Sequence, residues 1–217
     1  AFFDLDRTLI DCNSGRLWMA FERREGRLPI KMWLQGMWWL FLYALGRDGL
    51  SEAYVRAVRG LKGQTEHLIA ERTRRWFEEE VRHRLRPGAH QALHQHRQQG
   101  DRLVLATSSS PYISACAMEA FGLTDGICTR FEVVDGVFTG QISEMAYGSE
   151  KAHRLAEWAQ KADICLEKAV FYTDSATDLA CLEMVGNPVV VNPDHRLRRL
   201  AVQRGWPVVD WGVSKSV

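Results

Sequence analysis

The first eight residues of this 217-residue chain constrain its fold most strongly. Residues 2–5, apolar apart from Asp4, predict a short buried strand, because the strands of parallel sheets are covered on both faces. The strand ends in the pattern Asp4-x-Asp6-x-Thr8. Open α/β sheets bind ligands outside the carboxyl ends of their strands, so this pattern predicts an acidic site at the edge of a parallel sheet.

Short acidic turns after strands are common, but three later features support the N-terminal pattern. A strand expected over 102–106 ends at Thr107, and a strand expected over 169–172 leads to Asp174 and Asp178. Lys151 stands at the start of a predicted helix, where the helix dipole does not favour a cation. Hydroxyl, acidic and ammonium groups are therefore expected to meet at one edge of the sheet.

The order of predicted elements indicates a sheet domain with an inserted helical segment. Residues 14–85 have a helical pattern throughout, interrupted at 25–29 and 46–51. After Pro87-Gly88, strands alternate with helices, which implies a parallel sheet. Asp135-Gly136 predicts a hairpin within 132–142. The other expected elements are helices over 89–99, 111–121, 150–161 and 176–185 and strands over 188–191 and 208–209.

These motifs, in this order, resemble those of the haloacid dehalogenase-like hydrolases, specifically the phosphoserine-phosphatase-like branch. The four motifs correspond to Asp4–Thr8, Leu103–Ser108, Lys151 and Phe171–Asp178. The resemblance implies an α/β fold with a Rossmann-like parallel sheet core, formed by residues 1–13 and 86–217. It also implies a helical cap inserted over residues 14–85, which closes over the active site.

The resemblance further implies a magnesium-dependent phosphatase that forms an aspartyl-phosphate. Asp4 is the expected nucleophile, and Asp6 the group that protonates the leaving oxygen and then activates water. Thr107 and Ser108 are expected to hold the transferring phosphoryl group, and Lys151 to offset its charge and lower the pKa of Asp4.

Magnesium prefers oxygen ligands and keeps several waters. The expected protein ligands are the carboxylates of Asp4 and Asp174 and the backbone carbonyl of Asp6. Asp178 is expected to orient these magnesium ligands without binding the ion itself, and Thr8 to brace the loop that carries Asp4 and Asp6.

Substrate recognition is where the chain departs from the family pattern. Phosphoserine phosphatases carry a glutamate nine residues after the nucleophile, and that position is Asn13 here. Ser108 and Ser109 replace a glycine pair, and Thr177 replaces an asparagine. Asn13, Arg56 and Arg59 are the candidate substrate-binding residues. A small phosphorylated metabolite is the expected substrate, with phosphoserine or a phospholipid head group of the phosphatidylglycerophosphate type as alternatives.

Composition gives information on nucleic-acid binding, on disulfides and on the cellular compartment. A formal net charge of +1 gives no basic surplus for binding nucleic acid. The five cysteines include no Cys-x-x-Cys pair, which fits a reducing cytoplasm better than a disulfide framework or a zinc site. Because the first motif begins at residue 4, we expect no signal peptide, and we expect a few residues to precede Ala1.

Two features allow other interpretations. The tryptophan-rich run 32–45 is nearly uncharged but short for a bilayer span, so it fits a buried cap helix or dimer contact. An apolar substrate pocket or a membrane-surface contact is the alternative. His90 and His94 share a helix face without a zinc-site carboxylate, which favours a solvated face.

Two other protein classes fit the sequence less well. A receiver-type signalling domain would be half this length, and a non-catalytic phosphate-binding module would not need every motif residue.

Overall fold

A six-stranded parallel sheet organises the computed structural model, which describes residues 1–31, 33–36, 38 and 50–214. The strand order is β3-β2-β1-β6-β7-β8, and every pairing within it is parallel. Strands β2 and β3 lie on one side of β1, and β6, β7 and β8 lie on the other. The strand order therefore reverses at β1, and open α/β sheets bind ligands at such a topological switch point. The strands are β1 (Phe2–Phe3), β2 (Val104–Ala106), β3 (Asp125–Ile127), β6 (Val170–Thr173), β7 (Asn187–Val191) and β8 (Val208–Val209).

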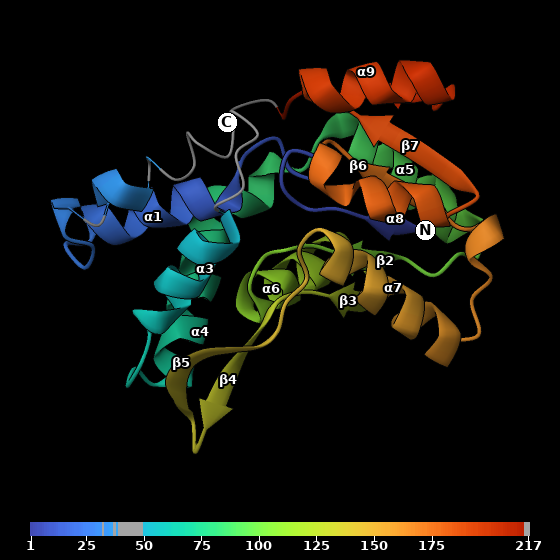
Figure 1. Ribbon diagram of the computed structural model, residues 1–217. Coiled ribbons are helices and arrows are strands. Elements are labelled where there is room, and N and C mark those ends of the chain that lie inside the picture. The colour runs from blue at the N-terminus through green and yellow to red at the C-terminus, as the bar shows by residue number, and fades with distance from the viewer. Residues whose placement is uncertain (32, 37, 39–49, 215–217) are drawn as a thin grey trace.

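Helices cover both faces of this sheet (Figure 1). Neighbouring residues of a strand point to opposite faces, and in β1 Phe3 packs into one hydrophobic core while Phe2 packs into the other. The first core includes residues of α5 (Pro87–Gln98) and α6 (Pro111–Phe121). The second includes residues of α7 (Ser149–Lys161), α8 (Leu179–Met184) and α9 (His195–Arg204). The predicted α/β fold with a parallel sheet is confirmed.

The segment between β1 and α5 is helical, as its sequence predicts. It contains α1 (Ser14–Arg24), α3 (Leu50–Arg59) and α4 (Glu66–Trp76), followed by a π-helical turn (Phe77–Val81) and a 3-10 turn (Arg82–Arg84). The predicted interruption at 25–29 is present, whereas most of 46–51 lies outside the described residues. A break that was not predicted separates α3 from α4, where Gly63 adopts a positive φ of 81°.

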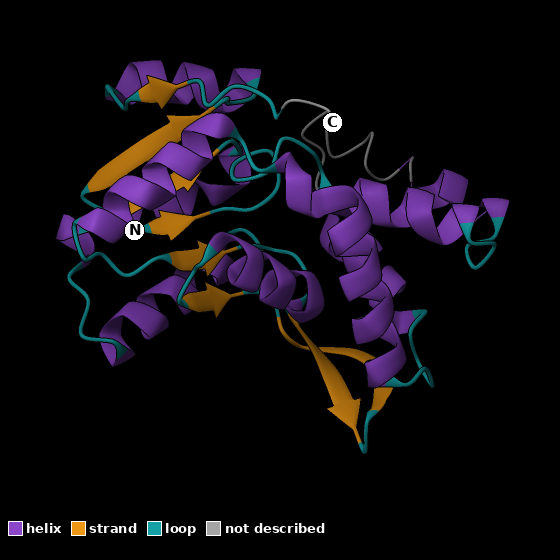
Figure 2. Ribbon diagram, turned by 180° about the vertical axis from the view of Figure 1, so that it is seen from behind, coloured by secondary structure: helices purple, strands orange, loops and turns teal. Residues whose placement is uncertain are grey.

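A hairpin of β4 (Arg130–Val134) and β5 (Val137–Glu144) stands apart from the main sheet (Figure 2). Its turn is the predicted Asp135-Gly136, and both residues have positive φ, as a tight hairpin turn requires. The hairpin pairs with the break between α3 and α4: the N–H groups of Gly63 and Glu66 donate to the carbonyls of Phe138 and Gly136 at 2.9 and 2.8 Å. The helical segment thus has a β partner from the predicted core range, and the boundaries of the predicted cap and core stay predictions.

Several details of the prediction need correction. The helix expected over 176–185 is a 3-10 turn (Ala176–Asp178) followed by the shorter α8. Strand β3 and helix α9 were not predicted, since β3 has a single large apolar residue and α9 has four arginines among its ten residues. Among the described helices none is both long and apolar enough to cross a membrane. Of the run 32–45, only 33–36 and 38 are described, so its role stays a prediction.

Candidate active site

The carboxyl ends of three adjacent strands bring the predicted site residues together. Asp4 follows β1, Thr107 follows β2 and Asp174 follows β6. The register continues past the strands, because the Asp4 N–H donates to the Tyr172 carbonyl at 3.0 Å. The central position of β1 therefore places Asp4 between the other two groups.

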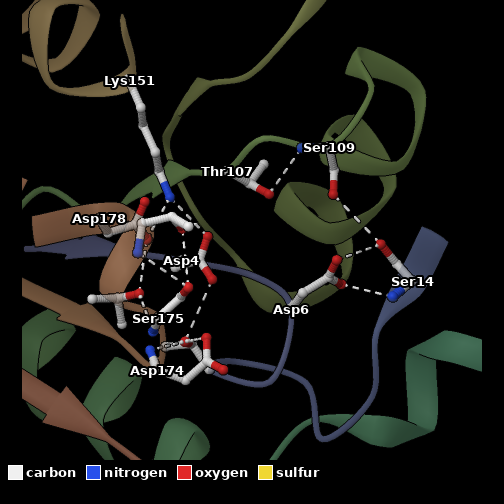
Figure 3. A network of polar contacts seen from close by, with 12 residues as sticks. Asp4, Asp6, Ser14, Thr107, Ser109, Lys151, Asp174, Ser175 and Asp178 are labelled. Carbon is white, nitrogen blue, oxygen red and sulfur yellow. Dashed lines mark hydrogen bonds and ion pairs between the residues drawn. The ribbon is translucent and has the colours of Figure 1, made fainter. Parts of the chain in front are cut away.

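Lys151 connects two of the carboxylates (Figure 3). Its Nζ lies 2.9 Å from Oδ1 of Asp4 and 2.8 Å from Oδ2 of Asp178, and the residue is only 1% exposed. The same Asp178 oxygen accepts the hydroxyl hydrogen of Thr173 at 2.7 Å. The ammonium also lies 5.6 Å from the ring centroid of Phe171. A buried lysine with two carboxylate partners stays charged, and these partners raise its pKa although burial by itself would lower it.

Thr8 joins the loop after β1 to the loop after β6. Its hydroxyl oxygen accepts the N–H of Asp174 at 3.0 Å. The same hydroxyl lies 3.5 Å from Oδ2 of Asp4 and 3.5 Å from Oδ1 of Asp174. The two carboxylates therefore face the same hydroxyl, and Thr8, predicted to brace one loop, contacts two.

Asp6 points to a second group of side chains, which Figure 3 shows on the other side of Asp4. Its carboxylate accepts the N–H of Ser14 at 2.8 Å and the hydroxyl hydrogen of Ser14 at 3.0 Å. The Ser14 hydroxyl also lies 3.4 Å from that of Ser109. Ser14 is the first residue of α1, so Asp6 occupies the helix N-terminus, where a negative charge is stabilised.

Two residues of this second group were missed by the sequence analysis, namely Ser14 and Ser109. The Asn13-Ser14 dipeptide is a helix-start signal, and it indicates free N–H groups close to Asp6. Thr107 is buried, and its hydroxyl accepts the N–H of Ser109 at 3.2 Å. Ser108 is half-buried beside it in the same loop.

The predicted substrate-binding residues lie in different surroundings. Asn13 is the N-cap of α1, and its side-chain oxygen accepts the N–H of Arg16 at 2.9 Å. Arg56 and Arg59 are both exposed on α3, and the backbone of Arg59 packs against Gly140 of β5. Their contact with substrate stays a prediction.

The site has a large excess of negative charge. Asp4, Asp174 and Asp178 are buried and Asp6 is half-buried, while the buried Lys151 pairs with Asp4 and Asp178. Burial, with the charges of Asp178 and Asp6, raises the pKa of Asp4 to about 7 although Lys151 lowers it. Burial also raises the pKa of Asp6 and, together with the charge of Asp4, holds the pKa of Asp174 well above its usual range. Lys151 lowers the pKa of Asp4, as expected, but burial raises this pKa by more.

This charge balance makes a testable prediction for the protein in EDTA. Because folding raises the pKa of Asp174, this carboxyl binds more protons in the folded protein than in the unfolded chain above pH 3.8, and its contribution to stability falls as pH rises. Asp174→Asn removes this titration. The variant should therefore unfold at higher urea than wild type, with a gap that widens from about pH 4 to pH 7. A gap that narrows with rising pH would contradict the raised pKa.

The chain is also similar to known proteins over nearly its whole length. "Phosphoserine phosphatase SerB1" of Mycobacterium tuberculosis is 27% identical over 100% of this chain and 72% of its own length. "Histidinol-phosphatase" of Neisseria meningitidis serogroup C is 29% identical over 97% of this chain and 98% of its own length. A crystal structure of a protein of unknown function from Bordetella pertussis Tohama I superimposes with a TM-score of 0.87 at 28% identity, covering 97% of both chains.

A family model described as haloacid dehalogenase-like hydrolase matches residues 1–183. The chain belongs to this family, as its motifs predict, and it is an enzyme of the phosphatase type.

Proposed function

We propose that this enzyme is a magnesium-dependent phosphomonoester hydrolase that acts through an aspartyl-phosphate on Asp4. The observation that carries the proposal is the position of the Asp4 carboxylate. It lies at the end of the central strand, 2.9 Å from the buried ammonium of Lys151 and next to the loop of Thr107. A carboxylate held in this way is placed to attack an incoming phosphorus atom, and the lysine offsets the charge that builds up.

Asp6 is placed to act as acid and base. Its carboxyl group would give a proton to the leaving oxygen, and the resulting carboxylate would then take one from the water that attacks the phosphoenzyme. Its raised pKa favours the protonated form that the first step needs. Asp6 accepts its hydrogen bonds from Ser14, whereas Asp4 accepts one from Lys151, and this difference supports separate roles for two carboxylates only two residues apart.

The residues fit a magnesium ion in one specific way. Within the described residues, no three His, Cys, Asp or Glu side chains are placed to hold a metal together. Asp4 and Asp174 nevertheless face one another across the Thr8 hydroxyl with charge that Lys151 does not balance. Two carboxylates and the Asp6 backbone carbonyl are the donors we propose, and a bound ion would neutralise the phosphate and orient it. Asp178, which is hydrogen-bonded to Lys151 and Thr173, would orient these ligands without binding the ion itself.

The proposed substrate is a small phosphorylated metabolite. The relatives' names suggest two amino-alcohol phosphates, phosphoserine and histidinol phosphate, while a phospholipid head group is a further alternative. Asn13 carries no charge to pair with a substrate ammonium, and its side chain caps α1. All five cysteines are free thiols, which supports the proposed location in a reducing cytoplasm.

Release of inorganic phosphate tests the proposal. The panel would contain O-phosphoserine, L-histidinol phosphate, O-phosphoethanolamine, glycerol 3-phosphate, phosphatidylglycerophosphate and para-nitrophenyl phosphate, each with magnesium and with EDTA. We expect release that requires magnesium, and the ranking would identify the substrate class. Equal release in EDTA would exclude the metal requirement, and no release from any ester would exclude the proposed activity.

Magnesium should also stabilise the fold through the same residues. A ligand at about 100 times its Kd stabilises a protein by about 2.7 kcal/mol, which for this size raises the Tm by roughly 5–10 °C. We expect such a rise in wild type and its loss in Asp174→Asn. Calcium and sodium serve as ionic controls. An equal rise in the variant would remove Asp174 from the proposed ligands.

A further inference from the structure

Ser14 bonds both oxygens of Asp6, the group that serves as acid and base in the proposed function. The Ser14 N–H donates to Oδ1 of Asp6 at 2.8 Å, and the Ser14 hydroxyl donates to Oδ2 at 3.0 Å. One hydrogen bond would leave the carboxyl group free to rotate, whereas two bonds to different oxygens fix its plane. Because each carboxylate oxygen has two lone pairs, acceptor positions remain for a proton transfer. Ser14 therefore fixes the orientation of Asp6 without occupying all of its acceptor positions.

Local structure defines the position of Ser14. The chain after Asp6 forms a closed loop, in which the Arg7 N–H donates to the Cys12 carbonyl at 3.0 Å. Ser14 follows this loop as the first residue of α1 and is 3% exposed, and the side chain of Asn13 caps the helix. Asp6 and Ser14 are thus the two ends of one hydrogen-bonded loop, and the first turn of α1 carries the serine that orients the acid.

A second hydroxyl group lies within reach of the Ser14 hydroxyl. It belongs to Ser109, and the two oxygens are 3.4 Å apart (Figure 3). The backbone of Ser109 is held on both sides, because its N–H donates to the Thr107 hydroxyl and its carbonyl accepts the N–H of Thr129, both at 3.2 Å. Hydroxyl groups rotate and can both donate and accept. The Ser14 hydroxyl can therefore donate to Asp6 while Asp6 is a carboxylate and turn to Ser109 when Asp6 is protonated.

The two oxygens of Asp6 differ in what faces them. The N–H of Ser14 at Oδ1 can only donate, so it favours an unprotonated oxygen there. The hydroxyl at Oδ2 can also accept or turn away, so Oδ2 is the oxygen that can carry a proton without opposing a donor.

We propose that Ser14 is a positioning residue, which orients Asp6 through its N–H and hydroxyl groups for both proton transfers of the reaction. This inference rests on the proposed function, which it deepens. In the first transfer, the proton on Oδ2 of Asp6 goes to the leaving oxygen as the bond between that oxygen and phosphorus breaks. In the second, Oδ2 takes a proton from the water whose oxygen bonds to phosphorus, which restores the acid.

Four variants separate the orientation of Asp6 from a purely structural role of Ser14. Ser14→Ala removes the hydroxyl group and keeps the N–H, while Ser14→Thr keeps both. Asp6→Asn is the reference for loss of the acid itself. Ser149→Ala is the matched control, because Ser149 is likewise the first residue of a helix, α7, and is exposed.

The leaving group reports whether the acid is in place. Phenyl phosphate releases a basic oxygen that needs a proton, whereas para-nitrophenyl phosphate, of similar shape, releases a much less basic one. With magnesium present, Ser14→Ala should lower kcat/KM by ~10-fold or more for phenyl phosphate but by less than about threefold for para-nitrophenyl phosphate. A smaller amount of folded protein would lower both values alike, so the ratio of the two does not depend on folding.

The other three variants calibrate this result. Asp6→Asn should show the same dependence on the leaving group with a larger loss, of about 100-fold or more for phenyl phosphate. Ser14→Thr should recover most of the activity that Ser14→Ala loses on phenyl phosphate, because the hydroxyl group is restored. Ser149→Ala should leave both esters unaffected.

The other outcomes overturn the inference. An equal loss of Ser14→Ala on both esters would make Ser14 a structural or phosphate-binding residue, and no loss on either would remove it from the reaction. Equal losses of Asp6→Asn on both esters would exclude Asp6 as the acid, and this inference with it, while the wild type remains a phosphatase. Inactivity of the wild type towards every phosphate ester in the presence of magnesium would instead exclude the proposed function.

Discussion

Asp4→Asn is expected to lower kcat by on the order of 10⁴-fold or more while leaving the protein folded, because an amide is not a nucleophile towards phosphorus. The fold should survive because Lys151 keeps its 2.8 Å contact with Asp178. The side-chain oxygen of an asparagine can also still accept from the lysine. Magnesium-dependent phosphate release, together with the circular dichroism spectrum and the Tm, measures both parts of this expectation.

The control for Asp4→Asn is the same change at an exposed position. Asp163 has a positive φ of 54°, a conformation that asparagine tolerates well, so Asp163→Asn should be active and folded. Activity of Asp4→Asn within tenfold of wild type would exclude Asp4 as the nucleophile. Mass spectrometry after a short incubation with substrate adds a direct test, since wild type, but not the variant, should carry a phosphoryl group on the peptide that contains residue 4.

Lys151→Met is expected to have the largest effect on stability. The substitution leaves Asp4 and Asp178 buried without their cation. Breaking a buried ion pair by removing one partner costs about 3–5 kcal/mol. For a protein of this size that corresponds to a Tm lower by roughly 6–20 °C. Differential scanning calorimetry in EDTA measures the loss, and phosphate release should be abolished as well.

Lys161→Met is the matched control, because Lys161 lies in the same helix and is exposed. Its Tm should stay within a degree or two of wild type, in keeping with the small effects of surface charges. Magnesium should recover part of the loss in Lys151→Met, since a cation reduces the repulsion between the carboxylates. A Tm equal to that of Lys161→Met would show that Lys151 does not hold the site together.

The strand ends of the site could be predicted because each motif combines a strand with the polar residue that follows it. Parallel strands end at one edge, so Asp4, Thr107 and Asp174 were expected at the same edge of the sheet; the strand order β2-β1-β6 then makes their strands neighbours. Lys151 was recognised from its motif order and from its unfavourable position at a helix start. No pattern in the sequence indicated that its two partners would be Asp4 and Asp178.

The missed residues have in common that their partners are distant in the chain. Ser14 meets Ser109 from 95 positions away, and the hairpin turn at Gly136 bonds to Glu66 across 70 positions. Ordinary serines and tyrosines carry no local signal of such contacts. The hairpin itself was predicted, since Asp135-Gly136 is a local turn signal, but not the helices it packs against.

The sequence alone determined the family, the parallel sheet and the acidic groups at its edge, because strand periodicity and motif order are local properties of the chain. Only the tertiary structure decided the charge balance of the active site and the hydrogen-bond partners of its residues. The pKa of Asp4 is raised to about 7 because folding buries it near other carboxylates, and Lys151 joins Asp4 to Asp178 although the three residues are far apart in the sequence. Burial and long-range contact arise from the packing of distant segments, and no short stretch of sequence contains them.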